Sequence, residues 1–447
     1  MISKTAAMEK EGIPAVGTVS DFMSEYTGTL KIENRMPNLR TCTTPMPTEV
    51  NARDLAIEYL PRLLDGLTAP LNDKETSGGT IPKEERERIA FTGSYEECLG
   101  FLSGEQSCST ASCTTVESSQ DRYTDGSGVV IPTPAMVSDM LTGTSHSPDE
   151  VIGIMHPGGL EFTVEKVAVN AVMAGCKPDY LPVVLAFSKI LATEGARLSR
   201  GGPPSIWPVV SGPITKEIGM DSASFMGGLN AANSSIGRAV ILMVLNLGRG
   251  ASILHSVHYS AFAENSDSPW TLLGEDIGLK REQNVVGLIG GANPETNFNS
   301  AHLYQKEGPE MYLKRLSRQI ARMHVGGEYP TILICPPIAR DLSSKLGMSK
   351  DDVKQWLYSN TFWSKEEYEW RAWRERPAPE DIRSLPEEAL IRVIGSKYNY
   401  RGQERGIEDR HDDVCILVAG GESPYPFVCK GNETPYRRWL EPVDMWR

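Results

Sequence analysis

Cys176 is the residue whose neighbours in the sequence point most directly to chemistry. It follows Gly175 and precedes Lys177 and Pro178. The glycine is typical of the position that ends a helix, and the proline of the first position of the next helix. A cysteine just before a helix N-terminus and beside a lysine is expected to have a lowered pKa, which favours the nucleophilic thiolate. Lys177 is also a candidate substrate-binding residue. The alternative is that Cys176 is a small buried apolar residue.

An amphipathic helix is expected immediately before this cysteine. Apolar residues recur at helical spacing from Val164 to Val172, and Thr163 can cap the first turn. His156 lies in a His-Pro-Gly-Gly turn upstream of the helix and is a candidate base for the thiol. Asn170 lies on the less apolar face of the helix, so it faces either a binding cleft or water.

A second cluster of polar residues stands at the start of another predicted helix. Gly227 and Gly228 are followed by Asn230, Asn233 and Arg238. Backbone amides at a helix N-terminus, with an arginine further along the helix, can form an anion site. These three polar residues are therefore candidates for holding an anionic substrate group; the alternative is helix capping. No G-x-G-x-x-G or P-loop pattern is present, so a nucleotide cofactor is not indicated.

A third cluster lies in a polar stretch between apolar elements. Glu264 is a candidate acid or base, and Asn265 a candidate binding residue, because loops on a rigid scaffold commonly carry such groups. A solvated loop is the alternative. His255 and His258 are three residues apart, but no third ligand is visible nearby, so no metal site is expected.

The eight cysteines form no CxxC or Cys/His ligand pattern, so a structural zinc site has no support in the sequence. Cys108 and Cys113 lie five apart in a Ser/Thr-rich segment, which is expected to be an exposed polar loop. A redox pair at these two cysteines is the alternative.

Composition limits the kind of partner. The net charge is −13, which argues against nucleic acid or an anionic membrane as a partner. No apolar run is long enough for a membrane span, and the first residues contain no secretory apolar region. A cytoplasmic location with reduced cysteines is expected.

Strands with glycine-rich exits alternate with helices, which predicts a layered α/β fold. No internal repeat at a fixed period is visible. A helix is expected at 50–67, bent or ended by Pro61. The predicted strands lie within 10–20, 201–214, 284–291, 330–337 and 414–421. The expected domains are a partial α/β domain at 1–72, a linker and polar loop at 73–124, and a main α/β domain at 125–447 with a surface helical insertion at about 349–394.

The chain resembles the UGSC-motif (seleno)protein family. The run VNAVMAGCKP carries the resemblance most specifically. Residues 1–72 resemble the part of that family's first domain that follows its Sec/Cys-Gly-Ser-Cys motif, which is absent from this sequence. Either translation was assigned from an internal start, or a small separate subunit carries the motif. The similar stretches are 125–153, 163–186, 228–246, 262–270 and 418–421.

The resemblance implies redox or strongly nucleophilic chemistry on a small, anionic molecule, because relatives carry selenocysteine. Cys176 would be the nucleophile or the resolving thiol of a thiol-dependent oxidoreductase. A second hypothesis is a lyase or transferase that makes or breaks a carbon–heteroatom bond. A third is a noncatalytic large subunit in a hetero-oligomer with a motif-bearing partner. Family analogy alone does not choose between them.

Overall fold

The computed structural model describes most of the chain and confirms a mixed α/β fold. The residues outside the described part are 1–4, 7, 10, 21–26, 28–30, 32–37, 46–51, 71–87, 104–122, 155–159, 200–205, 224–229, 249–259, 291, 297–299, 324–328, 373–379, 396–410, 423–426 and 433–435. Among the described helices, none has the length and apolar character needed to cross a membrane.

Near the N-terminus, a parallel strand pair precedes a long helix. Strand β1 (Gly17–Ser20) pairs with β2 (Thr41–Thr44), and α3 (Ala52–Thr68) follows. Pro61 was expected to bend or end this helix; it lies inside α3, so it does not end the helix. The guanidinium of Arg40 donates to the carbonyls of Gly66, Ala69 and Pro70, and so satisfies backbone acceptors at the C-terminal end of α3.

The first of two larger sheets has the strand order β14-β7-β5-β6. Its inner strand β5 (Ile206–Ser211) is apolar up to Ser211 and buried at every position, as expected for a strand covered on both faces. Strand β6 (Phe262–Ala263) runs parallel to β5, whereas β7 (Val285–Gly290) runs antiparallel to it. Strand β14 (Leu440–Pro442) pairs with β7 in antiparallel orientation.

The second larger sheet has the strand order β12-β9-β13-β8. Strand β12 (Cys415–Val418) is parallel to the central strand β9 (Tyr329–Ile334), and β13 (Phe427–Asn432) and β8 (Ala292–Thr296) complete the sheet in antiparallel pairs. The strands expected within 10–20, 201–214, 284–291, 330–337 and 414–421 are therefore confirmed.

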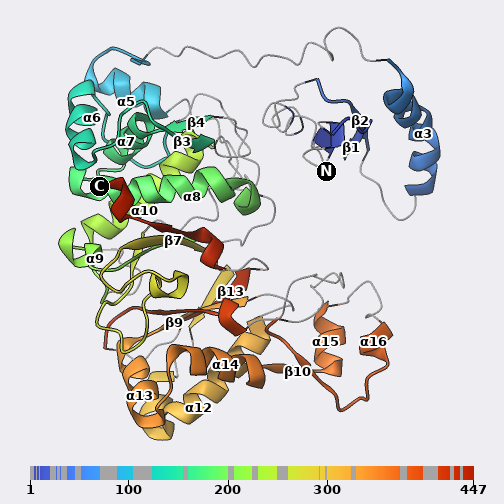
Figure 1. Cartoon of the computed structure of the whole chain (residues 1–447), viewed down its shortest axis with the longest axis vertical. Coiled ribbons are helices and arrows are strands. Elements are labelled where there is room, and N and C mark those ends of the chain that lie inside the picture. The colour runs from blue at the N-terminus through green and yellow to red at the C-terminus, as the bar shows by residue number, and fades with distance from the viewer. Residues whose placement is uncertain are drawn as a thin grey trace.

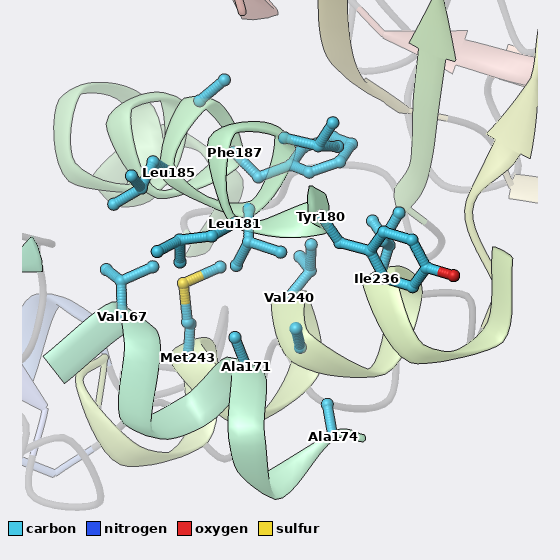
Figure 2. Packing of buried hydrophobic residues seen from close by; sticks show 14 of the residues in the cluster. Val167, Ala171, Ala174, Tyr180, Leu181, Leu185, Phe187, Ile236, Val240 and Met243 are labelled. Carbon is cyan, nitrogen blue, oxygen red and sulfur yellow. The ribbon is translucent and has the colours of Figure 1, made fainter. Parts of the chain in front are cut away.

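Figure 1 shows these strands between two groups of helices. The upper group packs around one large apolar cluster, part of which Figure 2 shows. In that view Val167 and Ala171 point toward Leu181 and Met243, so three helices share one core. The group comprises α5 (Tyr95–Ser103), α6 (Pro134–Met140), α7 (Val164–Met173), α8 (Leu181–Ser199) and α10 (Ala231–Asn246), beside the hairpin of β3 (Val151–Ile154) and β4 (Glu161–Thr163).

The ends of α7 follow the expectation from the sequence. The Thr163 hydroxyl accepts the backbone N–H of Lys166 and caps the helix. Gly175 has φ 81°, a left-handed conformation that favours glycine. Pro178 opens the 3-10 turn Pro178–Tyr180, which leads into α8.

Gly237 brings α10 directly against the chain that enters β6. A Cβ atom built on Gly237 would lie 2.6 Å from the backbone N of Ala261 and 2.6 Å from the carbonyl carbon of Ser260. The helix backbone and the incoming strand are therefore in contact with no side chain between them.

The lower group of helices covers the second sheet (Figure 1). Segment 349–394 was expected to lie on the surface, but its first helix, α14, is part of the core, because Val353 and Leu357 are fully buried. The rest of the segment contains a two-stranded antiparallel sheet and short helices. The elements are α12 (Ser300–Met323), α13 (Pro336–Leu346), α14 (Lys350–Asn360), β10 (Phe362–Ser364), α15 (Lys365–Ala372), α16 (Glu380–Arg383) and β11 (Leu390–Arg392).

The two larger sheets are built from the same succession of elements. In each, a helix leads into a central strand, two helices follow, and an edge strand runs parallel to the central strand; in the second half β10, α15, α16 and β11 come before this edge strand. The sequences correspond at the same places: VVSGPITKE at 209–217 matches LICPPIARD at 333–341, and FAENSDSPW at 262–270 matches LVAGGESPY at 417–425. The offset is not constant, because segment 349–394 lengthens the second half, so a search for a fixed period misses the repeat.

Matching contacts accompany the matching sequences. Glu264 N–H donates to Val210, at 2.9 Å, and its counterpart Ala419 N–H donates to Ile334, at 3.1 Å. The exposed ion pair Lys216–Asp267 in the first half corresponds to Arg340–Glu422 in the second. From these correspondences we infer that the chain contains an internal duplication, in which α9 (Ile214–Glu217) corresponds to the start of α13.

Candidate functional site

The two halves meet at the carboxyl ends of their parallel strands. Asn265 N–H, just after β6, donates to the carbonyl of Val418 at the end of β12, at 2.8 Å. Gly420 N–H donates across the junction to Ser222, at 2.9 Å. Ligands in α/β proteins commonly bind beyond the carboxyl ends of parallel strands, so the side chains at this junction are the first to consider.

Glu264 is the most unusual side chain at the junction. Only 2% of the residue is exposed. Its Oε2 accepts the Ser211 hydroxyl at 2.5 Å and the backbone N–H of Leu273 at 2.8 Å. Burial raises the pKa of Glu264, although Lys350 acts in the opposite direction. The result is a carboxyl group that holds its proton more tightly than a carboxyl in water.

Near Glu264, helix α14 carries two lysines whose side chains are buried and have polar partners. Lys350 Nζ pairs with Asp276 at 2.7 Å, and both side chains are almost fully buried. The Tyr436 hydroxyl donates to Asp276 at 2.8 Å, and Lys354 Nζ donates to the Tyr436 oxygen at 3.1 Å. Lys350 and Lys354 are one helical turn apart, so they reach the same side of α14.

Burial shifts the pKa values of several side chains in this region, which we call the buried cluster. Its members are Ser211, Glu264, Asp276, Lys350, Lys354, Cys415 and Tyr436. Burial lowers the pKa of Lys354 to about 8 and raises the pKa of the Cys415 thiol to about 12. A buried carboxyl with a raised pKa and a buried lysine with a lowered pKa are typical of groups that exchange protons near neutral pH.

Cys176 lies outside this cluster. It packs against the apolar cluster of the upper helices and lies near Ser235, which forms a hydrogen bond with its thiol. Burial raises the pKa of Cys176 to about 12, and the contact with Ser235 offsets this only in part. This direction runs against the expectation that the helix terminus and the exposed Lys177 favour the thiolate, because burial penalises the charged form, although the residue itself is only half-buried. The role of Cys176 stays a prediction.

Arg238 contacts a carboxylate of its own chain. Its guanidinium forms two hydrogen bonds with Asp125, at 2.9 and 3.3 Å, and two more with the carbonyls of Ser127 and Gly128. Asp125 is almost fully buried in this contact. An internal anion therefore occupies the place expected for an anionic substrate group.

The two asparagines near Arg238 also have internal partners. Asn230 caps α10 by accepting the N–H groups of Ala232 and Asn233, which confirms the capping alternative. Asn233 is fully buried, accepts the N–H of Asp221 and donates to the carbonyls of Asp221 and Ala261. These contacts fasten the loop after α9 and the entry to β6 onto α10.

The side chains of Asn170 and Asn265 also have partners within the chain. Asn170 is buried rather than facing a cleft or water: it donates to the carbonyl of Lys166 and accepts Asn246 Nδ2 at 2.7 Å, between α7 and α10. The Asn265 side chain accepts the N–H of Asp267 and shapes the loop after β6. His156, His255, His258, Cys108, Cys113, Gly227 and Gly228 lie outside the described residues.

The sequence interpretation missed the lysines of the buried cluster, although a signal was present. Lys350, Val353, Lys354 and Leu357 follow the spacing of one helical stripe, and all four are buried. Two lysines on an otherwise apolar stripe indicate buried charges, which require partners. Those partners, Asp276 and Tyr436, are distant in the sequence.

No family model, curated protein or solved structure matches the chain. The resemblance to the UGSC-motif proteins therefore stays a prediction that rests on the motifs quoted above.

Proposed function

We propose that the protein is an enzyme that transfers protons to and from a small molecule at the junction of its two halves, with Glu264 as the acid–base group. The observation that carries the proposal is the burial of the Glu264 carboxyl at the carboxyl ends of β5 and β6, held by Ser211 and Leu273. The second half lacks this carboxyl group, because its residue at the position of Glu264 is Ala419. The carboxyl is therefore particular to the first half, which supports a specific role.

The physical argument is the cost of a buried carboxyl group. A carboxyl placed away from water is unfavourable when ionised, and its usual use in an enzyme is as a proton donor with a raised pKa. Ser211 and the N–H of Leu273 fix the position of Oε2, which general acid–base catalysis requires. Two roles, donor when protonated and base when ionised, are then available to one group.

The thiol-dependent reaction expected for Cys176 stays a prediction, as do the lyase or transferase and the noncatalytic subunit. A thiol role has a second candidate position in Cys335. This residue is the counterpart of Ser211 in the internal duplication, directly follows β9 and occupies the N-cap position of α13. Cysteines at helix N-termini are commonly the reactive ones.

The test is consumption of small molecules from a metabolite extract, followed by mass spectrometry, with the full chain. Four variants are compared with the unmodified protein: Glu264→Gln, Cys176→Ser, Cys335→Ser and the matched control Glu422→Gln, which alters an exposed glutamate. We expect Glu264→Gln to lower the rate about 10²–10⁴-fold, as removal of an acid–base group does. Glu422→Gln should leave the rate unchanged.

The outcomes separate the hypotheses. Equal rates in Glu264→Gln and the unmodified protein would refute the proposal. Loss of turnover in Cys176→Ser or Cys335→Ser, together with a requirement for an external thiol, would favour the oxidoreductase. Turnover by the unmodified protein that needs no external thiol would favour the lyase. No consumption by any form would favour the noncatalytic subunit.

The expected partners are tested separately. A native mass measurement on protein from its own source, with peptide mapping of what co-purifies, decides between a homo-oligomer and a complex with a small motif-bearing subunit. The expected cytoplasmic location also stays a prediction.

A further inference from the structure

We propose a binding site for a zinc-class divalent cation formed by Asp351, His411 and Asp412. The three side chains each offer one ligand atom, and these atoms lie within 4.8 Å of one another. Two elements supply them: the first turn of α14 carries Asp351, and the 3-10 turn His411–Asp413 before β12 carries the other two. The site is separate from Glu264 and does not depend on the proposed acid–base reaction.

The two distances from the His411 imidazole fit a shared cation. His411 Nε2 lies 3.3 Å from Asp351 Oδ1 and 3.1 Å from Asp412 Oδ1. Zinc–ligand bonds of about 2.0–2.2 Å place neighbouring ligand atoms roughly 3.3–3.5 Å apart in a tetrahedral site. Charge-assisted hydrogen bonds are shorter, about 2.7–2.9 Å, so the contacts of His411 with the two carboxylates are long for hydrogen bonds of this kind.

The surroundings leave these ligands available. The capping box of α14 uses Ser349 and Asp352, so Asp351 is not needed for the helix cap. The side chains of Asp351, His411 and Asp412 are 70%, 30% and 41% exposed, so a hydrated cation can reach all three. Three protein ligands with room for water match the pattern of open zinc sites.

Charge and chemistry favour a zinc-class cation. Two carboxylates beside a neutral imidazole carry two negative charges, which a divalent cation neutralises. Arg437 lies 4.0 Å from the outer oxygen of Asp412 and 3.6 Å from Asp413, so it compensates this charge only in part. An imidazole ligand favours zinc over magnesium or calcium, which prefer all-oxygen sites.

The pattern is not visible in the sequence, because Asp351 is 60 residues from His411. Packing of α14 against the turn before β12 creates the site.

The test is titration of the full-length, chelator-treated protein with Zn²⁺ by calorimetry, and with Co²⁺ by visible absorption. The variants are His411→Ala and Asp351→Asn. The matched control is His146→Ala, which removes another partly exposed imidazole that faces a carboxylate, Glu150. Circular dichroism checks that each variant is folded, and Asp351→Asn alters an exposed side chain outside the helix cap.

We expect one equivalent of Zn²⁺ to bind the unmodified protein and His146→Ala. Both site variants should bind at least about 100-fold more weakly, since loss of a ligand costs more than the 10–100-fold typical of an outer contact. Equal affinity in all four proteins would place the metal elsewhere and overturn the proposal. Absence of Zn²⁺ binding by the unmodified protein would overturn it as well.

Discussion

Arg238 and Asp125, 113 residues apart in the sequence, form a two-pronged ion pair that fastens α10 to the segment before α6. Because Asp125 is almost fully buried, removal of the arginine leaves an uncompensated charge. We expect Arg238→Met to lower the free energy of unfolding by about 3–5 kcal/mol, the usual cost of breaking a buried pair. Thermal and urea unfolding measure this change.

The matched control for that variant is Lys216→Met. Lys216 pairs with Asp267 on the surface, where both side chains are mostly exposed, so the expected loss is within about 1 kcal/mol. If Arg238→Met kept full stability but lost binding of an anionic ligand, the ion pair would not be structural and the anion site would regain support.

Gly237 and Gly100 both lie in helices, but alanine is expected to have opposite effects on stability at these two positions. A methyl group at Gly237 meets the backbone of Ser260 and Ala261, so Gly237→Ala should destabilise the protein by about 1–3 kcal/mol. Gly100 lies in α5 with open space around it, so Gly100→Ala should stabilise by about 0.5–1 kcal/mol through helix propensity. A melting temperature that does not fall for Gly237→Ala would contradict the close contact at Gly237, and one that falls for Gly100→Ala would contradict the open space at Gly100.

Cys176 should react slowly with iodoacetamide. Its pKa of about 12 leaves almost no thiolate at neutral pH. Allowing for the greater nucleophilicity of a basic thiolate, we expect alkylation on the order of 100-fold slower than for free cysteine, with a rate that still rises above pH 9. Peptide mapping after timed labelling measures the rate. Labelling of Cys176 within minutes at neutral pH would instead support the activated thiol expected from the sequence.

His146 should make stability depend on pH. It contacts the carbonyl of Met445 and the carboxylate of Glu150, and these contacts raise its pKa. Because the folded-state pKa is raised, this stabilisation is fully present below the unfolded value of about 6.5 and is lost as the pH rises through the folded value.

The variant that tests this linkage is His146→Gln. The difference in unfolding free energy between the unmodified protein and the variant should be larger at about pH 6 than at about pH 9, as measured by urea unfolding across that range. A difference that stays constant, or grows with pH, would show that protonation of His146 does not stabilise the fold.

Local structure could be predicted from the sequence where it depends on neighbouring residues. Thr163, Gly175 and Pro178 correctly marked the ends of α7 and the start of the next turn, because caps and left-handed positions depend on residue type. The strands could also be predicted, because short apolar runs followed by glycine or proline mark them in the sequence. Of the two effects expected for Pro61, an end of the helix did not occur, because α3 continues to Thr68.

The candidate site was predictable only in part, because residue type does not identify a partner. Glu264 was a candidate because it is a polar group between apolar elements, but its burial could not be predicted, since it follows from the packing of the two halves. Arg238 and Asn233 had the right chemistry for binding a substrate, but segments distant in the sequence use those groups internally. Asp276 and Lys350 come together only in the folded chain.

The direct contact at Gly237 also restricts how the protein can move. A helix that slides along a sheet by one turn replaces each contact residue with the one four positions away. For α10 this would press Asn233 or Ile241 against Ser260 and Ala261, where no side chain fits. A shift of α10 by one turn would therefore require the chain at Ser260 and Ala261, which leads to Glu264, to move as well.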